Sequence, residues 1–166
     1  MQKTKRKRWL FGVLSLAVMA LIFAFSMENG AQSSDTSGRV VRVLLALLYP
    51  GYDALPAAEQ ETLFSLGQTV VRKGAHFSIY ACLGFCLMMF WKTFAVRSRA
   101  LLAFLCTVGY ACTDEVHQLF VDNRSGSFKD VLLDSAGAVA GILLARGVLH
   151  VYNKKRELRR SGGNKR

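Results

Sequence analysis

The chain has 166 residues, of which 52% are hydrophobic, yet it carries a formal net charge of +11. A mean hydropathy of +0.25 excludes an ordinary soluble domain, because apolar runs of membrane-spanning length need a phase other than water. Four apolar runs, at residues 9–27, 75–94, 100–113 and 131–149, predict an all-α, polytopic membrane protein. The third run is long enough to span only if its polar C-terminal end lies at the outer boundary, and the fourth only if its ends lie among the headgroups. We expect a single domain with about four transmembrane helices and an additional amphipathic helix at the outer face.

The first predicted transmembrane helix covers residues 9–27 and follows a basic segment, residues 1–8. A basic start and an apolar centre also occur in cleaved signal peptides, but the apolar core of a signal peptide is typically ~7–15 residues long. The apolar run here is longer, and the NGAQSS sequence that follows it is a poor cleavage site. We therefore expect this helix to be retained as a membrane anchor.

A long outer loop, residues 28–72, is predicted to contain amphipathic helices. The segment RVVRVLLALLY (Arg39–Tyr49) is apolar but too short to span a bilayer, which favours an interfacial or re-entrant segment. YPGYDALP then predicts a turn. From Ala57 onward, Leu63, Leu66 and Val70 recur at helical spacing, and this predicts a helix that continues into the next transmembrane segment.

Three more transmembrane helices are predicted at residues 73–95, 99–118 and 131–149, with an outer loop at 119–130 and a basic tail at 150–166. In the last helix, GAVAG places Gly137 and Gly141 one turn apart, a pattern that permits close packing of membrane helices.

The basic residues define an orientation. They cluster before the first helix, between the second and third helices (Lys92, Arg97 and Arg99), and after the fourth helix. The positive-inside rule then places both termini in the cytoplasm and both loops of mixed charge outside. We expect no nucleic-acid partner, because the basic tails lack the motifs or aromatic residues of a nucleic-acid-binding module.

The predicted topology brings polar residues from three helices to one level near the outer membrane boundary. Ionisable groups at membrane depth normally face a bundle interior or a water-filled cavity. We therefore predict one shared pocket, in which Arg124 of the short loop neutralises crowded carboxylates. The candidate residues are Lys73, His76, Tyr80, Asp114, Glu115, His117, Gln118, Arg124, Ser127, Asp130 and Asp134.

Purely structural roles compete with a functional one at several of these positions. Ser127 or Asp130 could be the N-cap of the fourth helix, and His76 could pair with Glu115 only to fix helix packing. A metal site built from His76, His117 and a carboxylate is chemically possible. Because no HExxH pair is present, we expect no metal and no cofactor.

Three motifs, KGAHFSIY, DEVHQLF and RSGSFKDVLLDSAG, occur in this order between Lys73 and Gly141. Together they resemble the VanZ family, small bacterial membrane proteins named for a glycopeptide (teicoplanin) resistance determinant. The family pattern covers the candidate residues from Lys73 to Asp134 except Ser127. This sequence departs from it twice: many members have Pro-Gly where it has Asp122-Asn123, and many have Asn where it has Asp134. The resemblance implies a role in the cell envelope and a location in the bacterial cytoplasmic membrane.

Two functional hypotheses follow. In one, the outer-face pocket binds an envelope lipid, a cell-wall precursor or a (lipo)glycopeptide and thereby affects glycopeptide susceptibility, with Lys73, Tyr80, Gln118, Arg124, Ser127, Asp130 and Asp134 as the ligand-binding residues. In the other, the protein is a membrane-embedded hydrolase or transferase, with His76, Asp114, Glu115 and His117 as acid–base residues acting on a lipid-linked anionic headgroup. Membrane lipids are partners in both hypotheses, and the sequence leaves the oligomeric state open.

Overall fold

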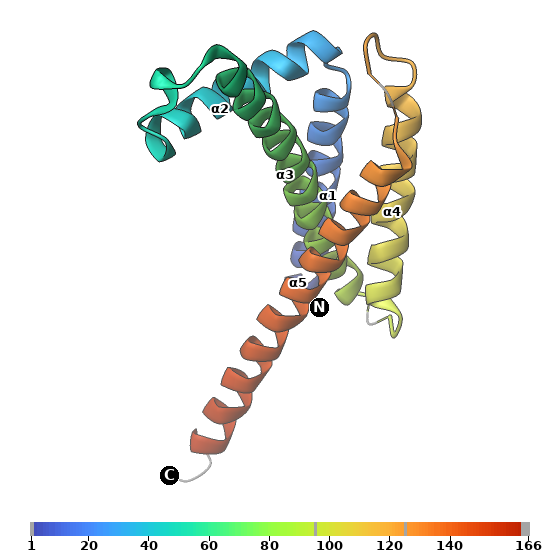
Figure 1. The fold of residues 1–166 in the computed structure, drawn as a ribbon. Helices are drawn as coiled ribbons and strands as arrows, with labels where there is room; N and C mark the ends of the chain where they lie inside the picture. The colour runs from blue at the N-terminus through green and yellow to red at the C-terminus, as the bar shows by residue number, and fades with distance from the viewer. Residues whose placement is uncertain (1, 95, 125, 164–166) are drawn as a thin grey trace.

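The structure is a computed structural model that describes residues 2–94, 96–124 and 126–163, and over these ranges it contains helices and no strand (Figure 1). The predicted all-α class is therefore confirmed. Four parts of the chain lie outside the described ranges: residue 1, residue 95 at the end of the predicted second transmembrane helix, Ser125, and residues 164–166 of the predicted tail. The elements are α1 (Gln2–Ser26), α2 (Gly30–Leu48), the short 3₁₀ helix η1 (Tyr52–Ala54), α3 (Ala57–Lys92), α4 (Arg99–Gln118) and α5 (Phe128–Gly163).

Three helical segments among the described residues are long and apolar enough to cross a membrane: Thr4–Ser26, Ala57–Lys92 and Phe128–Arg159. They correspond to the first, second and fourth of the predicted spans. The helix at the predicted third span, α4, has 20 residues and ends in a polar turn that contains Asp114 and Glu115. Large apolar side chains cover the outside of these helices, and Trp9, Leu16 and Leu144 are 76%, 65% and 63% exposed. Apolar exposure on this scale is typical of a surface that faces lipid.

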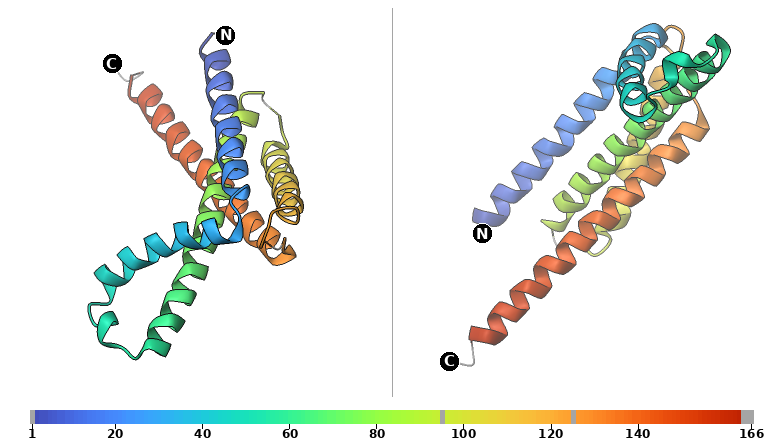
Figure 2. Two further views of the ribbon diagram at one scale, coloured as in Figure 1. Left: turned by 90° about the horizontal axis from the view of Figure 1, so that it is seen from above. Right: turned by 60° about the vertical axis from the view of Figure 1, so that its left-hand side comes forward.

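The helices run alternately up and down. The start of α1 and the end of α5 point toward one end of the molecule, while α2 and the loop between α4 and α5 lie at the other (Figures 1 and 2). We call the latter the polar end: the part of the structure where α1 ends, α4 ends and α5 begins. With 36 residues, α5 is about 54 Å long, so its basic C-terminal part extends well beyond the other helices (Figure 2).

Helices α3 and α5 approach each other closely because glycines lie at their crossing. A Cβ atom at Gly137 would collide with the carbonyl oxygen of Phe77, and one at Gly141 would collide with that of Ala81. The GAVAG segment therefore has the packing role expected of it. Toward the opposite end of the molecule from α2, an apolar core fills the space between α3, α4 and α5 around Met88, Ala103, Ile142, Ala145 and Leu149.

Several helices are longer than predicted. The segment expected at Arg39–Tyr49 is the second half of α2, which begins at Gly30 because Asn29 and Gln32 form a capping box. The amphipathic helix from Ala57 and the second transmembrane helix are one continuous helix, α3. α1 and α5 also continue through the described parts of the two basic tails. α2 packs against the first half of α3, where the Gln68 side chain donates to the Ser34 carbonyl at 2.8 Å.

Candidate functional site at the polar end

Asp114 lies between α3 and α4 and accepts two hydrogen bonds through one of its carboxylate oxygens. Its Oδ2 atom accepts a hydrogen bond from the Tyr80 hydroxyl at 3.1 Å and one from the Gln118 amide at 3.3 Å. All three side chains are buried. Gln118 comes from the same face of α4 one turn later, and Tyr80 comes from α3. The three residues therefore join α3 to α4, and we call them the Asp114 group.

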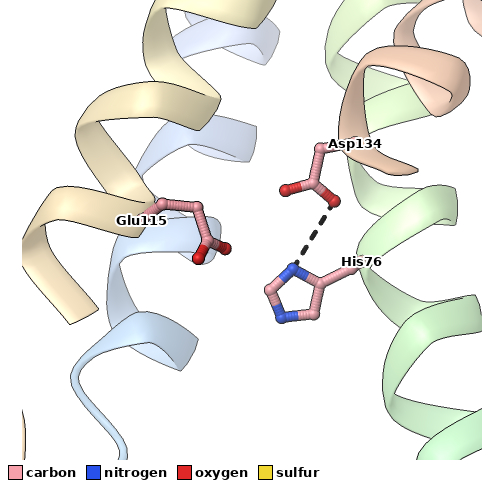
Figure 3. A group of neighbouring side chains, drawn as sticks. All are labelled: His76, Glu115 and Asp134. Atoms are coloured by element: carbon pink, nitrogen blue, oxygen red, sulfur yellow. Dashed lines mark ion pairs between the residues drawn. The ribbon is translucent and has the colours of Figure 1, made fainter. Parts of the chain in front are cut away.

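Glu115, the next residue along α4, lies in a different setting (Figure 3). Its carboxyl group points toward His76 of α3 and Asp134 of α5, and one potential ligand atom from each residue lies within 4.8 Å of the other two. The His76 Nδ1 to Asp134 Oδ1 distance is 3.6 Å, slightly beyond hydrogen-bond range. We call these three residues the His76 group.

Hydrogen bonding in the His76 group is incomplete. Glu115 Oε2 accepts from the backbone N–H of Ser127 at 2.7 Å. Four buried atoms of the group have no partner among the described residues: His76 Nδ1, Glu115 Oε1 and both carboxylate oxygens of Asp134. Asp134 is completely buried and Glu115 is 5% exposed. Unsatisfied buried polar atoms are rare in native proteins and call for an explanation.

The first turn of α5 carries two more candidate residues. The Ser127 hydroxyl accepts from the backbone N–H of Lys129 at 3.2 Å, so Ser127, and not Asp130, has the N-cap role that the sequence left open. Asp130 pairs with Lys73 of α3, with 2.8 Å between Oδ1 and Nζ. Both partners of this ion pair remain partly exposed.

Arg124 lies against the end of α1. Its guanidinium donates to the carbonyl oxygens of Phe25 and Ser26 at 3.1 and 3.3 Å and to the Ser33 hydroxyl at 3.2 Å. These carbonyls belong to the last turn of α1, which has no intrahelical donor for them. Arg124 therefore caps α1 and connects it to α2. The carboxylates that we expected it to neutralise lie within no ion-pair distance of it among the described residues.

His117 faces α1 and not His76. Its Nδ1 atom is 3.3 Å from the Ser26 hydroxyl, and its ring lies 5.0 Å from that of Phe23, centroid to centroid. Within the described residues, His117 is not part of the group that could hold a metal ion.

Two cavities meet at this end of the molecule. The first, of about 210 Å³, lies between α1, α2 and α3 and has mostly apolar walls that include Ile22, Val40 and Ile79. The second, of about 220 Å³, has polar walls that include Lys73, Gln118 and Asp130. Arg72, His76 and Arg124 line both cavities. An apolar space therefore adjoins a polar one, and three basic side chains lie at the wall that they share.

A scan against protein-family models gives a match to VanZ/LLP1 over residues 11–150. The chain belongs to the VanZ/LLP1 family. The match covers most of the chain and includes both candidate groups, the loop at 119–127, all of the segment Ala57–Lys92 and most of the other two segments that could span a membrane. No curated protein and no solved structure matches the chain.

One departure from the VanZ pattern has a simple structural explanation. Asn123 has a φ angle of +56°, a left-handed conformation for which glycine is best suited and asparagine is the most tolerant alternative. Asn123 therefore suits this conformation at the position where many relatives carry Gly. The same loop approaches α2 closely, because the Gly30 N–H donates to the Asp122 carbonyl at 3.2 Å.

Sequence reasoning missed three residues of this VanZ-family site: Ser26, Ser33 and Arg72. Arg72 was not among the predicted site residues, although it lines both cavities. The two serines lie at the end of α1 and the start of α2. The sequence does not indicate that these helices contact the loop at 119–127, apart from a run of small residues at 33–38.

Proposed function

We propose that this VanZ-family protein spans the bacterial cytoplasmic membrane with four helices, keeps both termini in the cytoplasm, and binds an amphiphile with an anionic headgroup at its polar end, on the outer face. The ligand is an envelope lipid or a (lipo)glycopeptide, and binding affects glycopeptide susceptibility. The observation that supports this most is the sharing of Arg72, His76 and Arg124 by an apolar and a polar cavity.

The four-helix topology includes α4 as a membrane span. α4 packs against α3 and α5, and its exposed apolar residues include Leu101, Leu105 and Val116. If α4 crosses the bilayer with its neighbours, the basic residues Lys92, Arg97 and Arg99 lie at the same side as both termini, in accord with the positive-inside rule. A topology reporter fused after Arg166 should be active only in the cytoplasm, and activity only outside the cell would refute this orientation.

The two cavities suit the two parts of an amphiphile. Apolar walls can accept part of an acyl or prenyl chain, while Arg72, Lys73 and Arg124 supply donors for a phosphate or carboxylate. Arg124 already donates to α1 and to Ser33, so its planar guanidinium is held in a fixed orientation beside the shared region. Lys at this position would supply the charge but not the planar fork.

An enzyme acting on a lipid-linked headgroup is the second candidate, and one observation favours it. Glu115 Oε1 is buried without a partner close to His76, an arrangement in which a carboxylate and an imidazole can move a proton. A Glu115→Gln variant separates the two functions, because it removes the base while keeping the size of the side chain. Turnover of the headgroup by the wild-type protein that Glu115→Gln abolishes would support the enzyme, whereas the absence of turnover by wild-type protein that retains the lipid would support the binding protein.

The binding proposal is tested by Arg124→Lys in expression-matched cells and in protein purified in mild detergent. We expect the variant to insert normally, to retain about tenfold less co-purified anionic lipid by native mass spectrometry, and to lose its effect on teicoplanin susceptibility. Arg39→Lys is the matched control, because Arg39 forms only an exposed ion pair with Asp35 at 2.6 Å. Full lipid retention and full activity in Arg124→Lys would refute the proposal.

A further inference from the structure

We propose that His76, Glu115 and Asp134 form a binding site for a divalent transition-metal ion. The sequence predicted no metal because it contains no HExxH pair, and the possible site that it offered combined His76 with His117, which faces α1. In the structure Asp134, and not His117, lies beside His76 and Glu115. One imidazole and two carboxylates from three helices therefore come together (Figure 3).

The main evidence is that four atoms of these side chains are buried without a hydrogen bond at the same point among the described residues, although His76 itself is only half-buried and lies at ion-pair distance from Asp134. Asp134 has no exposed surface and no hydrogen bond to either carboxylate oxygen among the described residues. Glu115 Oε1 and His76 Nδ1 are also buried without a hydrogen bond among the described residues. An ionised carboxylate without a compensating partner is strongly unfavourable in a buried site. A cation between the three side chains would contact each group that now lacks a partner.

The spacing fits coordination after small side-chain movements. Zn²⁺ binds histidine nitrogen and carboxylate oxygen at about 2.0–2.2 Å, which places neighbouring ligand atoms of a tetrahedral site roughly 3.4 Å apart. The His76 Nδ1 and Asp134 Oδ1 atoms are 3.6 Å apart, and every pair in the group is within 4.8 Å. Shifts of the order of an ångström would be enough to bring the third side chain into position.

The surroundings also resemble those of a metal site. The Ser127 backbone N–H fixes Glu115 through Oε2, leaving Oε1 for the metal, and such outer hydrogen bonds commonly orient metal ligands. Two carboxylates balance the charge of a divalent ion. The imidazole favours Zn²⁺ or Mn²⁺ over Mg²⁺ or Ca²⁺, which prefer sites made only of oxygen.

Three protein ligands leave at least one coordination position open. His76 lines both cavities, so an ion bound beside it lies at their shared wall. Resting on the proposed function, we infer that the open position accepts an oxygen of the anionic headgroup. The metal site itself does not depend on this second step.

The experiment uses tag-free, full-length protein in detergent, stripped with EDTA and then titrated with Zn²⁺ and, separately, with Mn²⁺. We expect one equivalent of at least one of the two ions to bind per chain and to raise the melting temperature. Co²⁺ added as a spectroscopic probe should give visible absorption bands that Zn²⁺ abolishes. His76→Ala, Glu115→Gln and Asp134→Asn should each weaken metal binding by at least tenfold.

His117→Gln is the matched control, since it alters the other histidine of this region and should leave the stoichiometry at one. Circular dichroism and gel filtration in EDTA establish that each variant remains folded, and Asp134→Asn is the variant least disturbing in size. The absence of stoichiometric binding by either ion to folded wild-type protein would overturn the site. Wild-type affinity in His76→Ala or Asp134→Asn would overturn it as well. Because the titration measures bound metal and not bound lipid, failure here is distinct from failure of the proposed lipid binding.

Discussion

Two buried carboxylates lie next to each other on α4, and their surroundings differ. Asp114 and Glu115 are each 5% exposed. Asp114 accepts hydrogen bonds from Tyr80 and Gln118, whereas Glu115 faces His76 and Asp134, with one of its oxygens unpartnered. Among the described residues, no atom of the Asp114 group is buried without a hydrogen-bond partner. The His76 group is incomplete until something else binds to it.

This difference indicates how the polar end is divided between stability and function. A buried carboxylate with two donors connects helices, as Asp114 connects α3 and α4, and its removal leaves those donors without an acceptor. Two carboxylates facing one imidazole, with four unpartnered atoms, add little stability to the protein without a ligand. We therefore expect substitutions in the Asp114 group to reduce stability, and those in the His76 group to reduce ligand binding.

The largest expected effect comes from the glycine that allows α3 and α5 to meet. Gly137→Leu would place a side chain against the backbone of Phe77, next to His76 and one turn from Asp134. We expect it to lower the free energy of unfolding by about 3 kcal/mol, the upper part of the usual range for overpacking, and to abolish metal binding. The free energy of unfolding is measured by unfolding in mixed detergent micelles with increasing SDS, and metal binding is measured by titration.

Gly147→Leu on the same helix is the control for this prediction. A Cβ atom at Gly147 meets nothing within 4 Å, so the substitution should be neutral or stabilise the helix by up to about 1 kcal/mol. Equal destabilisation by both substitutions would mean that helix propensity or detergent effects, and not the α3–α5 contact, determine the result.

The next effect tests the comparison itself, with the same side chain deleted in each group. Asp114→Ala leaves the Tyr80 hydroxyl and the Gln118 amide buried without their acceptor, which should lower the free energy of unfolding by about 2 kcal/mol. Asp134→Ala removes a carboxylate that has no hydrogen bond, and in EDTA it should be at least 1 kcal/mol less destabilising than Asp114→Ala. Both free energies are measured by SDS unfolding in EDTA. If Asp134→Ala is the more destabilising variant, the two groups do not differ in the way we describe.

Much of the fold was predictable from the sequence because membrane helices are specified by long apolar runs. The bounds of α4 match the predicted segment 99–118. Because successive long helices run in opposite directions, the end of α4 and the start of α5 lie at the same end of the molecule. Their meeting with α3 at the polar end therefore followed from the predicted topology. The longer extents of α1 and α5 were not predicted, because helices continue past the membrane boundary wherever no residue stops them.

The partners within the site were less predictable. Helical phase places Asp114 and His117 on one stripe of α4, but α4 contacts α1, α3 and α5, so residues within one turn face different neighbours. His117 therefore meets Ser26 while Asp114 meets Tyr80. Arg124 was expected among carboxylates because they are the only opposite charges in the sequence nearby. Its observed acceptors are mainly backbone carbonyls, and every residue type has one of those.

The smallest expected effect concerns Lys73, which belongs to neither group and forms an ion pair with Asp130. Its Nζ atom is 2.8 Å from Asp130 Oδ1, yet the two side chains are 50% and 32% exposed, and exposed ion pairs contribute about 0–1 kcal/mol. Asp130 also lies in the first turn of α5, where the helix dipole stabilises a negative charge even without Lys73. Lys73→Met keeps most of the aliphatic side chain, so it should change the free energy of unfolding by no more than about 0.5 kcal/mol. A double-mutant cycle with Asp130→Asn should give a coupling energy equally small.

Such a result would mean that Lys73 can leave Asp130 at little cost and turn to an anionic headgroup in the polar cavity that both residues line. The same Lys73→Met protein should then retain several-fold less anionic lipid in native mass spectrometry. A coupling above about 1.5 kcal/mol would instead make the ion pair a structural link between α3 and α5, with Lys73 unavailable to a ligand.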